Sequence, residues 1–147
     1  MAQAVSSKIR WWLWPGSNDE PSLVLIWGPV AVWMAIMFWF SSQASLPSAP
    51  DSFLDLLMKK GAHFSEYAVL AALWIRAFRA VNWPRGSLSA ILAFALTIAY
   101  ATSDEFHQSF VPNRHPMVTD VFIDGFGALV AIAVFLLSSR RHRDVSE

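Results

Sequence analysis

The sequence predicts an all-α integral membrane protein, a four-helix bundle with both termini on the cytoplasmic side. Of the 147 residues, 55% are hydrophobic and 15% are charged, a balance too apolar for a soluble domain of this length. Four apolar stretches alternate with polar segments, and each is about long enough to cross the hydrocarbon core of a bilayer as a helix. The uneven distribution of Lys and Arg between the polar segments sets the orientation.

The first span is expected over about residues 23–41, which contain no charged residue. Before it, residues 1–22 combine basic residues with a cluster of tryptophans, a composition typical of the membrane–water boundary. We therefore expect a cytoplasmic segment that lies on the membrane surface. After the span, residues 42–58 contain serines, prolines and aspartates, which predicts a loop, with a short amphipathic turn at Phe53, Leu54 and Leu57 as an alternative within it.

The other spans are predicted over about residues 61–78, 87–104 and 117–138. The second span is short and begins with polar residues, whereas the fourth is apolar until it reaches a cluster of arginines. Residues 139–147 are therefore expected to form a basic cytoplasmic tail. Together the four spans form one membrane domain, residues 23–138.

The basic residues fall into two unequal groups when the segments between the spans are assigned to alternating sides of the membrane. One side carries Lys8, Arg10, Arg76, Arg79, Arg85, Arg140, Arg141 and Arg143, and the other carries Lys59, Lys60 and Arg114. By the positive-inside rule the larger group is cytoplasmic. The polar residues that begin the second and fourth spans and follow the third then meet at the extracytoplasmic face.

Composition also limits the partners and the chemistry. The absence of cysteine excludes disulfides, thiolate metal sites and cysteine nucleophiles. No basic patch with interleaved aromatic residues is present, so nucleic acid is not an expected partner. Membrane lipids are the expected partners of a multi-pass protein of a cytoplasmic membrane.

Three groups of polar residues carry the candidate site: one begins the second helix, one runs from Asp104 to Arg114 at the end of the third, and one begins the fourth. Residues His63 and Glu66 follow Lys60 at helical spacing, so they form one stripe on the second helix. An ionisable group at the depth of Glu66 is costly if it faces lipid, so it should face the bundle. Asp120 and Asp124 lie one turn apart on the fourth helix, and two carboxylates at this spacing repel each other unless a cation or a proton lies between them.

These groups resemble the signature blocks of the VanZ-like family over about residues 59–131. The three blocks are Lys60-x-x-His63-Phe64-x-Glu66-Tyr67, Asp104-Glu105-x-His107-Gln108-x-Phe110-Val111-Pro112-x-Arg114 and Asp120-x-x-x-Asp124-x-x-Gly127. The resemblance implies a small bacterial membrane protein with a polar site, related to a protein associated with resistance to the glycopeptide teicoplanin. It supplies no reaction.

The resemblance also implies which residues form the site. The candidates for catalysis are His63, Glu66, Asp104, Glu105 and His107. The candidates for substrate binding are Lys60, Tyr67, Gln108, Arg114, Asp120 and Asp124.

Three hypotheses follow for these residues. In the first, an enzyme acts on a lipid-linked or cell-envelope substrate, with cations on its phosphate or carboxylate and a histidine as general acid or base. In the second, the same groups bind an anionic headgroup, a peptidoglycan precursor or a glycopeptide without transforming it. In the third, the charges only fix the register of the helices, although so many ionisable groups at one membrane depth favour a function.

A metal-dependent form of the first hypothesis would use nitrogen and oxygen ligands from His63, His107, Asp120 and Asp124. Their spacing matches no known metal motif, so the sequence assigns no metal or other cofactor.

Overall fold

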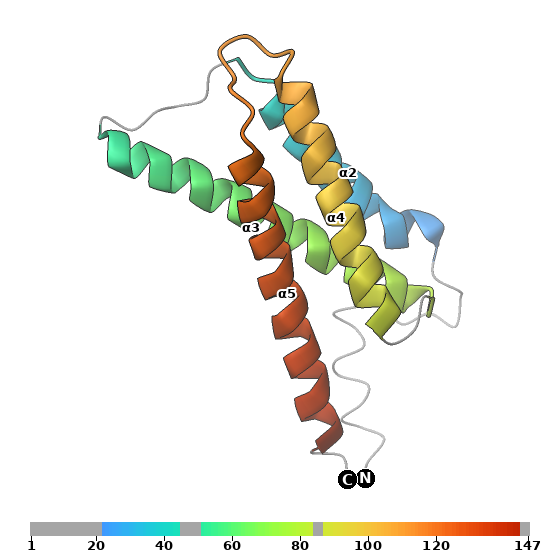
Figure 1. The fold of residues 1–147 in the computed structure, drawn as a ribbon. Helices are drawn as coiled ribbons and strands as arrows, with labels where there is room; N and C mark the ends of the chain where they lie inside the picture. Colours follow the sequence, from blue (N-terminus) through green and yellow to red (C-terminus); the bar gives the residue numbers. More distant parts are fainter. Residues whose placement is uncertain (1–21, 45–50, 84–86, 145–147) are drawn as a thin grey trace.

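The computed structural model describes residues 22–44, 51–83 and 87–144, with backbone only from residue 139 onward. These residues form four helices and no strand, which confirms the all-α prediction (Figure 1). The helices are α2 (Leu23–Ser41), α3 (Ser52–Ala80), α4 (Ser87–Gln108) and α5 (Val118–Asp144). The expected interfacial segment at residues 1–21 and the side chains of the basic tail lie outside the described residues.

Three of the helices are long and apolar enough to cross a membrane: α2, α4 and the part of α5 from Val118 to Ser138. Helix α3 is not among them, although a span was predicted at residues 61–78. The reason is its composition, because His63, Glu66 and Arg76 interrupt the apolar run. A fourth membrane-crossing segment therefore stays a prediction.

Helix α3 begins at Ser52, so the prediction of a loop over residues 42–58 is wrong for its second half. Asp51 caps the helix, because its Oδ1 accepts a hydrogen bond of 2.8 Å from the backbone N–H of Leu54. Asp55 then pairs with Lys59 one turn later, at 2.7 Å. These local interactions stabilise helical turns that project beyond the bundle in Figure 1.

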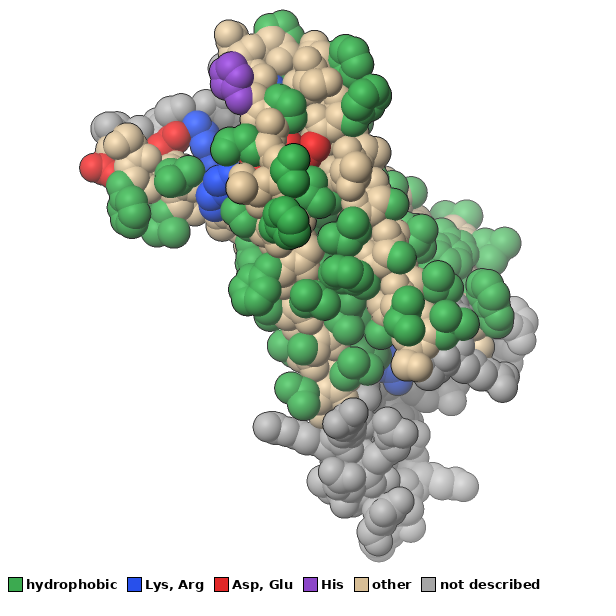
Figure 2. Space-filling model, in the orientation of Figure 1, with side chains coloured by type: hydrophobic (Ala, Val, Ile, Leu, Met, Phe, Trp, Pro, Cys, Tyr) green, Lys and Arg blue, Asp and Glu red, His purple; other side chains and the backbone are tan. Residues whose placement is uncertain are grey.

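Two apolar clusters form the core, and α3 contributes to both. The first joins α2, α3 and α4 through residues such as Ile26, Tyr67 and Ala101. The second joins α3, α4 and α5 through residues such as Ile75 and Ala128. Outside the core, hydrophobic side chains cover α4 and α5 on the face shown in Figure 2, as expected for a surface in contact with lipid.

Helices α3 and α5 approach each other most closely at Gly127. A Cβ atom at this position would lie 2.2 Å from the backbone carbonyl oxygen of Phe64. Gly125 plays a similar part against α4, since a Cβ there would lie 2.9 Å from Ile98 Cδ1. Gly125 directly follows Asp124 and Gly127 lies three positions after it, so the close packing constrains where this carboxylate lies.

We predict that Gly127→Ala destabilises the protein by at least about 1–3 kcal/mol, because the added methyl group meets backbone and cannot be accommodated by a side-chain rotation. Gly61→Ala is the matched control on α3, since a Cβ there has no neighbour within 4 Å. The control should be neutral or stabilising by about 0.5–1 kcal/mol. Thermal unfolding in detergent measures both variants, and equal melting temperatures would contradict the packing described above.

Candidate functional site

A cavity of about 630 Å³ lies at the end of the bundle where α2 and α4 terminate and α5 begins. The projecting part of α3 forms one of its walls. The predicted site residues that line it are Lys60, His63, Glu66, Asp104, Gln108, Arg114 and Asp120. The structure thus brings together residues from three helices and a turn.

The turn between α4 and α5 closes this end of the structure. Helix α4 continues to Gln108, one turn beyond the predicted end of its span at residue 104. Asn113 then adopts a left-handed conformation with φ of 63°, which asparagine tolerates better than most residues. The following Arg114 donates hydrogen bonds from Nε to the carbonyl of Gln43, at 2.9 Å, and from Nη2 to the carbonyl of Phe40, at 3.0 Å.

Arg114 therefore stabilises the C-terminal end of α2, where unpaired carbonyl groups and the helix dipole favour a cation. It also lines the cavity. Its guanidinium carries five N–H donors, so the two bonds to α2 leave donors for a ligand.

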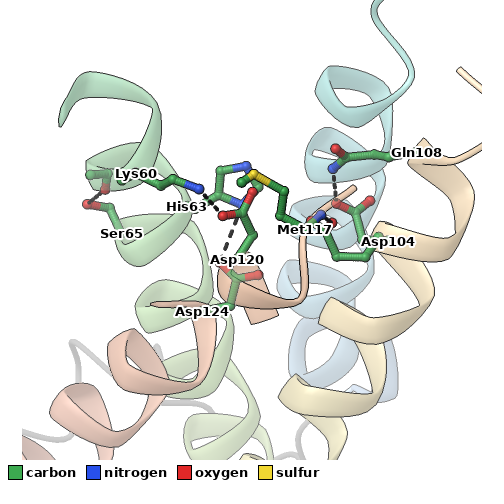
Figure 3. A network of polar contacts seen from close by, with 10 residues as sticks. Lys60, His63, Ser65, Asp104, Gln108, Met117, Asp120 and Asp124 are labelled. Atoms are coloured by element: carbon green, nitrogen blue, oxygen red, sulfur yellow. Dashed lines mark hydrogen bonds and ion pairs between the residues drawn. The ribbon is translucent and has the colours of Figure 1, made fainter. Parts of the chain in front are cut away.

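The lysines on α3 are also paired. Lys60 forms an ion pair with Asp120 on α5, and the two side chains are 26% and 14% exposed (Figure 3). Lys59 pairs with Asp55 within α3. Asp120 is thus the anionic partner of Lys60, and the repulsion expected between Asp120 and Asp124 is reduced by this cation.

Asp124 is fully buried, and its nearest charged partner is His63 on α3. The distance from His63 Nδ1 to Asp124 Oδ1 is 3.3 Å (Figure 3). Neither oxygen of Asp124 has a hydrogen-bond partner within the described part of the chain. The contact joins the two helices one turn away from the close approach at Gly127.

Glu105 on α4 is 8% exposed and lies beside this pair. Its Oε2 accepts a hydrogen bond of 2.8 Å from the backbone N–H of Met117, which fixes the start of α5 against α4. Its Oε1 has no hydrogen-bond partner among the described residues. One carboxylate oxygen of Glu105 therefore contacts the start of α5, and the other is available to a ligand.

The remaining acidic and aromatic candidates lie around this cluster. Asp104 Oδ2 accepts a hydrogen bond of 2.9 Å from Gln108 Nε2, one turn along α4 (Figure 3). Glu66 lines the cavity, and its backbone carbonyl accepts a bond of 3.0 Å from Trp33 Nε1 on α2. Tyr67 belongs to the apolar core instead, with a side chain that is 1% exposed.

His107 lies apart from the other candidates. Its Nε2 is 3.1 Å from Ser42 Oγ, and its ring lies on that of Phe38 with 4.5 Å between the centroids. These contacts place it against the end of α2, and it does not line the cavity. His115, which was not among the predicted residues, does line it. The sequence offered no signal for this, because His115 lies in an irregular turn.

Three ligand atoms can converge on one metal ion. One atom each from His63, Glu105 and Asp124 lies within 4.8 Å of the others. This set shares only two members with the four metal ligands considered from the sequence. Asp120 and His107 are not part of it, because Asp120 is paired with Lys60 and His107 contacts Ser42. Glu105 is the third possible ligand instead.

A match to the family model VanZ/LLP1 covers residues 26–139, most of the chain. The chain belongs to the VanZ/LLP1 family. The match begins within α2 and extends through α5, well beyond the three blocks that carry the resemblance in the sequence. No curated protein and no solved structure shows significant similarity to the chain.

Arg114→Ala should lower the free energy of unfolding by about 1–3 kcal/mol, because it leaves the carbonyl groups of Phe40 and Gln43, in and just after the last turn of α2, without their charged donor. Lys59→Ala is the control: it removes an exposed pair within one helix, which contributes only about 0.3–0.5 kcal/mol. Thermal unfolding followed by circular dichroism measures the difference. If both variants melt at the same temperature, Arg114 does not stabilise the end of α2.

Proposed function

We propose that this VanZ/LLP1 protein binds a lipid-linked or cell-envelope substrate with an anionic headgroup and acts on it at the extracytoplasmic face of a bacterial cytoplasmic membrane. One observation carries the proposal. The cavity is lined by three cations, by His63 with several carboxylates, and by apolar residues.

The cations suit a phosphate or carboxylate group. Lys59, Lys60 and Arg114 all line the cavity, and each retains donors beyond those used within the protein. A headgroup phosphate can therefore bind without leaving Asp55 or Asp120 unpaired. Such a ligand would be held by charge complementarity at the membrane surface.

The apolar residues suit the lipid part of the substrate. Met37 and Phe40 on α2 and Leu56 and Met58 on α3 line the same cavity. The last two lie on the projecting turns of α3, which are also apolar at Phe53. An acyl or polyprenyl chain can leave the cavity along this surface into the surrounding bilayer.

His63 is the residue best placed for chemistry on the headgroup. Its Nδ1 faces the buried Asp124, an arrangement that orients an imidazole and stabilises its protonated form. The ring also lines the cavity. Acid or base catalysis on a phosphate or acyl linkage is the reaction class that these groups support, with Glu66 and Asp104 as further proton-accepting groups in the lining.

Binding without a reaction is the second candidate function, and a specific observation favours it. His107, one of the two histidines expected to act, is held against α2 outside the cavity. The paired cations of the cavity are sufficient to bind an anionic headgroup or a cell-wall precursor without a second catalytic histidine. A role in teicoplanin resistance would be compatible with either function and is tested by susceptibility measurements on a deletion strain.

The proposed ligand can be detected by native mass spectrometry of the protein extracted from its own membrane. We expect an anionic lipid or polyprenyl phosphate to copurify with the wild type and to be reduced at least tenfold in the Lys60→Ala, Arg114→Ala double variant. Arg79→Ala is the control, because Arg79 lies over the Phe135 ring at 4.9 Å, away from the cavity lining. Equal lipid content in all three proteins would contradict the proposal.

The orientation can be tested separately, because the chain contains no native cysteine. Ser109→Cys lies just after α4 at the cavity end, and Ser87→Cys lies at the opposite end of the same helix. Both serines are exposed. A membrane-impermeant maleimide should label Ser109→Cys in intact bacterial cells and Ser87→Cys only after lysis. The reverse pattern would place the cavity on the cytoplasmic side.

A further inference from the structure

Apart from His63, no basic side chain in the described part of the protein forms an ion pair with the buried Asp124 or Glu105. Asp124 is completely buried, and neither of its carboxylate oxygens has a hydrogen bond in the described residues. Glu105 Oε1 is likewise buried and has no hydrogen bond there. Asp104 and Asp120 lie close enough to interact electrostatically with Asp124 and add negative charge. Unpaired carboxylates in such a place cost several kcal/mol each unless a counter-charge or a proton is present.

The nearby basic side chains make their closest contacts elsewhere. Lys60 is paired with Asp120, Lys59 with Asp55, and Arg114 donates to the carbonyl groups of Phe40 and Gln43. His63 is the basic group in contact with Asp124, and its Nδ1 is buried without a properly formed hydrogen bond. One imidazole therefore lies close to two buried carboxylates that each have an oxygen without a hydrogen bond.

We propose that His63, Glu105 and Asp124 bind a divalent transition-metal ion. Their ligand atoms lie within 4.8 Å of one another, and two ligands of a common ion at about 2.0–2.2 Å from it lie roughly 3–4 Å apart. Small side-chain rotations are sufficient to close the site around an ion. The two carboxylates neutralise its charge, and the ion replaces the missing hydrogen bonds.

The ligand set selects the kind of metal. One imidazole and two carboxylates suit Zn²⁺, Mn²⁺ or Fe²⁺, whereas Ca²⁺ prefers six to eight oxygen ligands. The orientation of Glu105 is already fixed, because its Oε2 accepts the N–H of Met117 while Oε1 remains available. An outer contact of this type is what metal sites use to orient a ligand.

An ion in this position would lie next to the cavity lined by His63 and Asp104. With the ion bound, His63 acts as a ligand, and the ion takes over the activation of water or polarisation of a phosphate that was assigned above to acid–base catalysis. The metal site itself does not depend on the substrate or on the occurrence of a reaction. Metal binding and lipid binding can therefore fail independently of each other.

The test uses the full chain, purified in detergent with any affinity tag removed, stripped with EDTA and titrated with Zn²⁺ and with Mn²⁺ by calorimetry. We expect about one ion per chain for the wild type. Asp124→Asn and Glu105→Gln keep the shape of the side chains, and the amide oxygen at position 105 can still accept the N–H of Met117. Both should weaken binding at least tenfold, on the order of the losses known for altered metal sites.

Asp120→Asn is the matched control, one turn before Asp124 on the same helix and paired with Lys60. It should weaken the binding of the ion less than either ligand variant does, because it removes a nearby charge but no ligand atom. Zinc K-edge absorption spectra of the wild type provide a readout that does not depend on variants, and should show imidazole and oxygen ligands. A folded wild type that binds neither ion, binding unchanged by both ligand variants, or a spectrum without imidazole would each overturn the proposal.

Discussion

The contact between the backbones of α3 and α5 at Phe64 and Gly127 is the constraint on which the site depends. Because no Cβ separates the helices there, His63 and Asp124 lie within 3.3 Å of each other although 61 positions apart in sequence. Glu105 then joins them through the bond from Met117 that holds the start of α5. The packing of three helices and the placement of three polar side chains are thus one structural feature.

The charges of the site are separated by depth. The cations Lys59 and Lys60 are partly exposed, and each has an acidic partner close to the surface. Asp124 and Glu105, whose carboxylates have oxygens without hydrogen bonds in the described residues, are buried. An anionic ligand therefore meets the cations first, whereas a cation is favoured further inside. This order is the one needed if a metal ion and a phosphate group bind side by side.

The sequence was sufficient to predict the fold class and the grouping of the site. Apolar run lengths locate α2, α4 and α5, and the shared depth of polar residues anticipates that Lys60, Asp104 and Asp120 line one cavity. It did not reveal the first turns of α3, because Asp51 and the prolines before it are as typical of a loop as of a capped helix. The position of a cap depends on a single hydrogen bond.

The sequence also could not predict which polar residues contact each other. Helical spacing puts His107 and Glu105 in the same segment, but their roles depend on which neighbouring helix each one faces. His107 faces Ser42 at the end of α2, whereas Glu105 faces the start of α5. The two residues are separated by two positions, roughly 200° around the helix axis, so only one of them can point toward His63 and Asp124. The rotation of α4 about its axis thus decides which acidic group completes the cluster, and the bond from Met117 to Glu105 fixes that rotation.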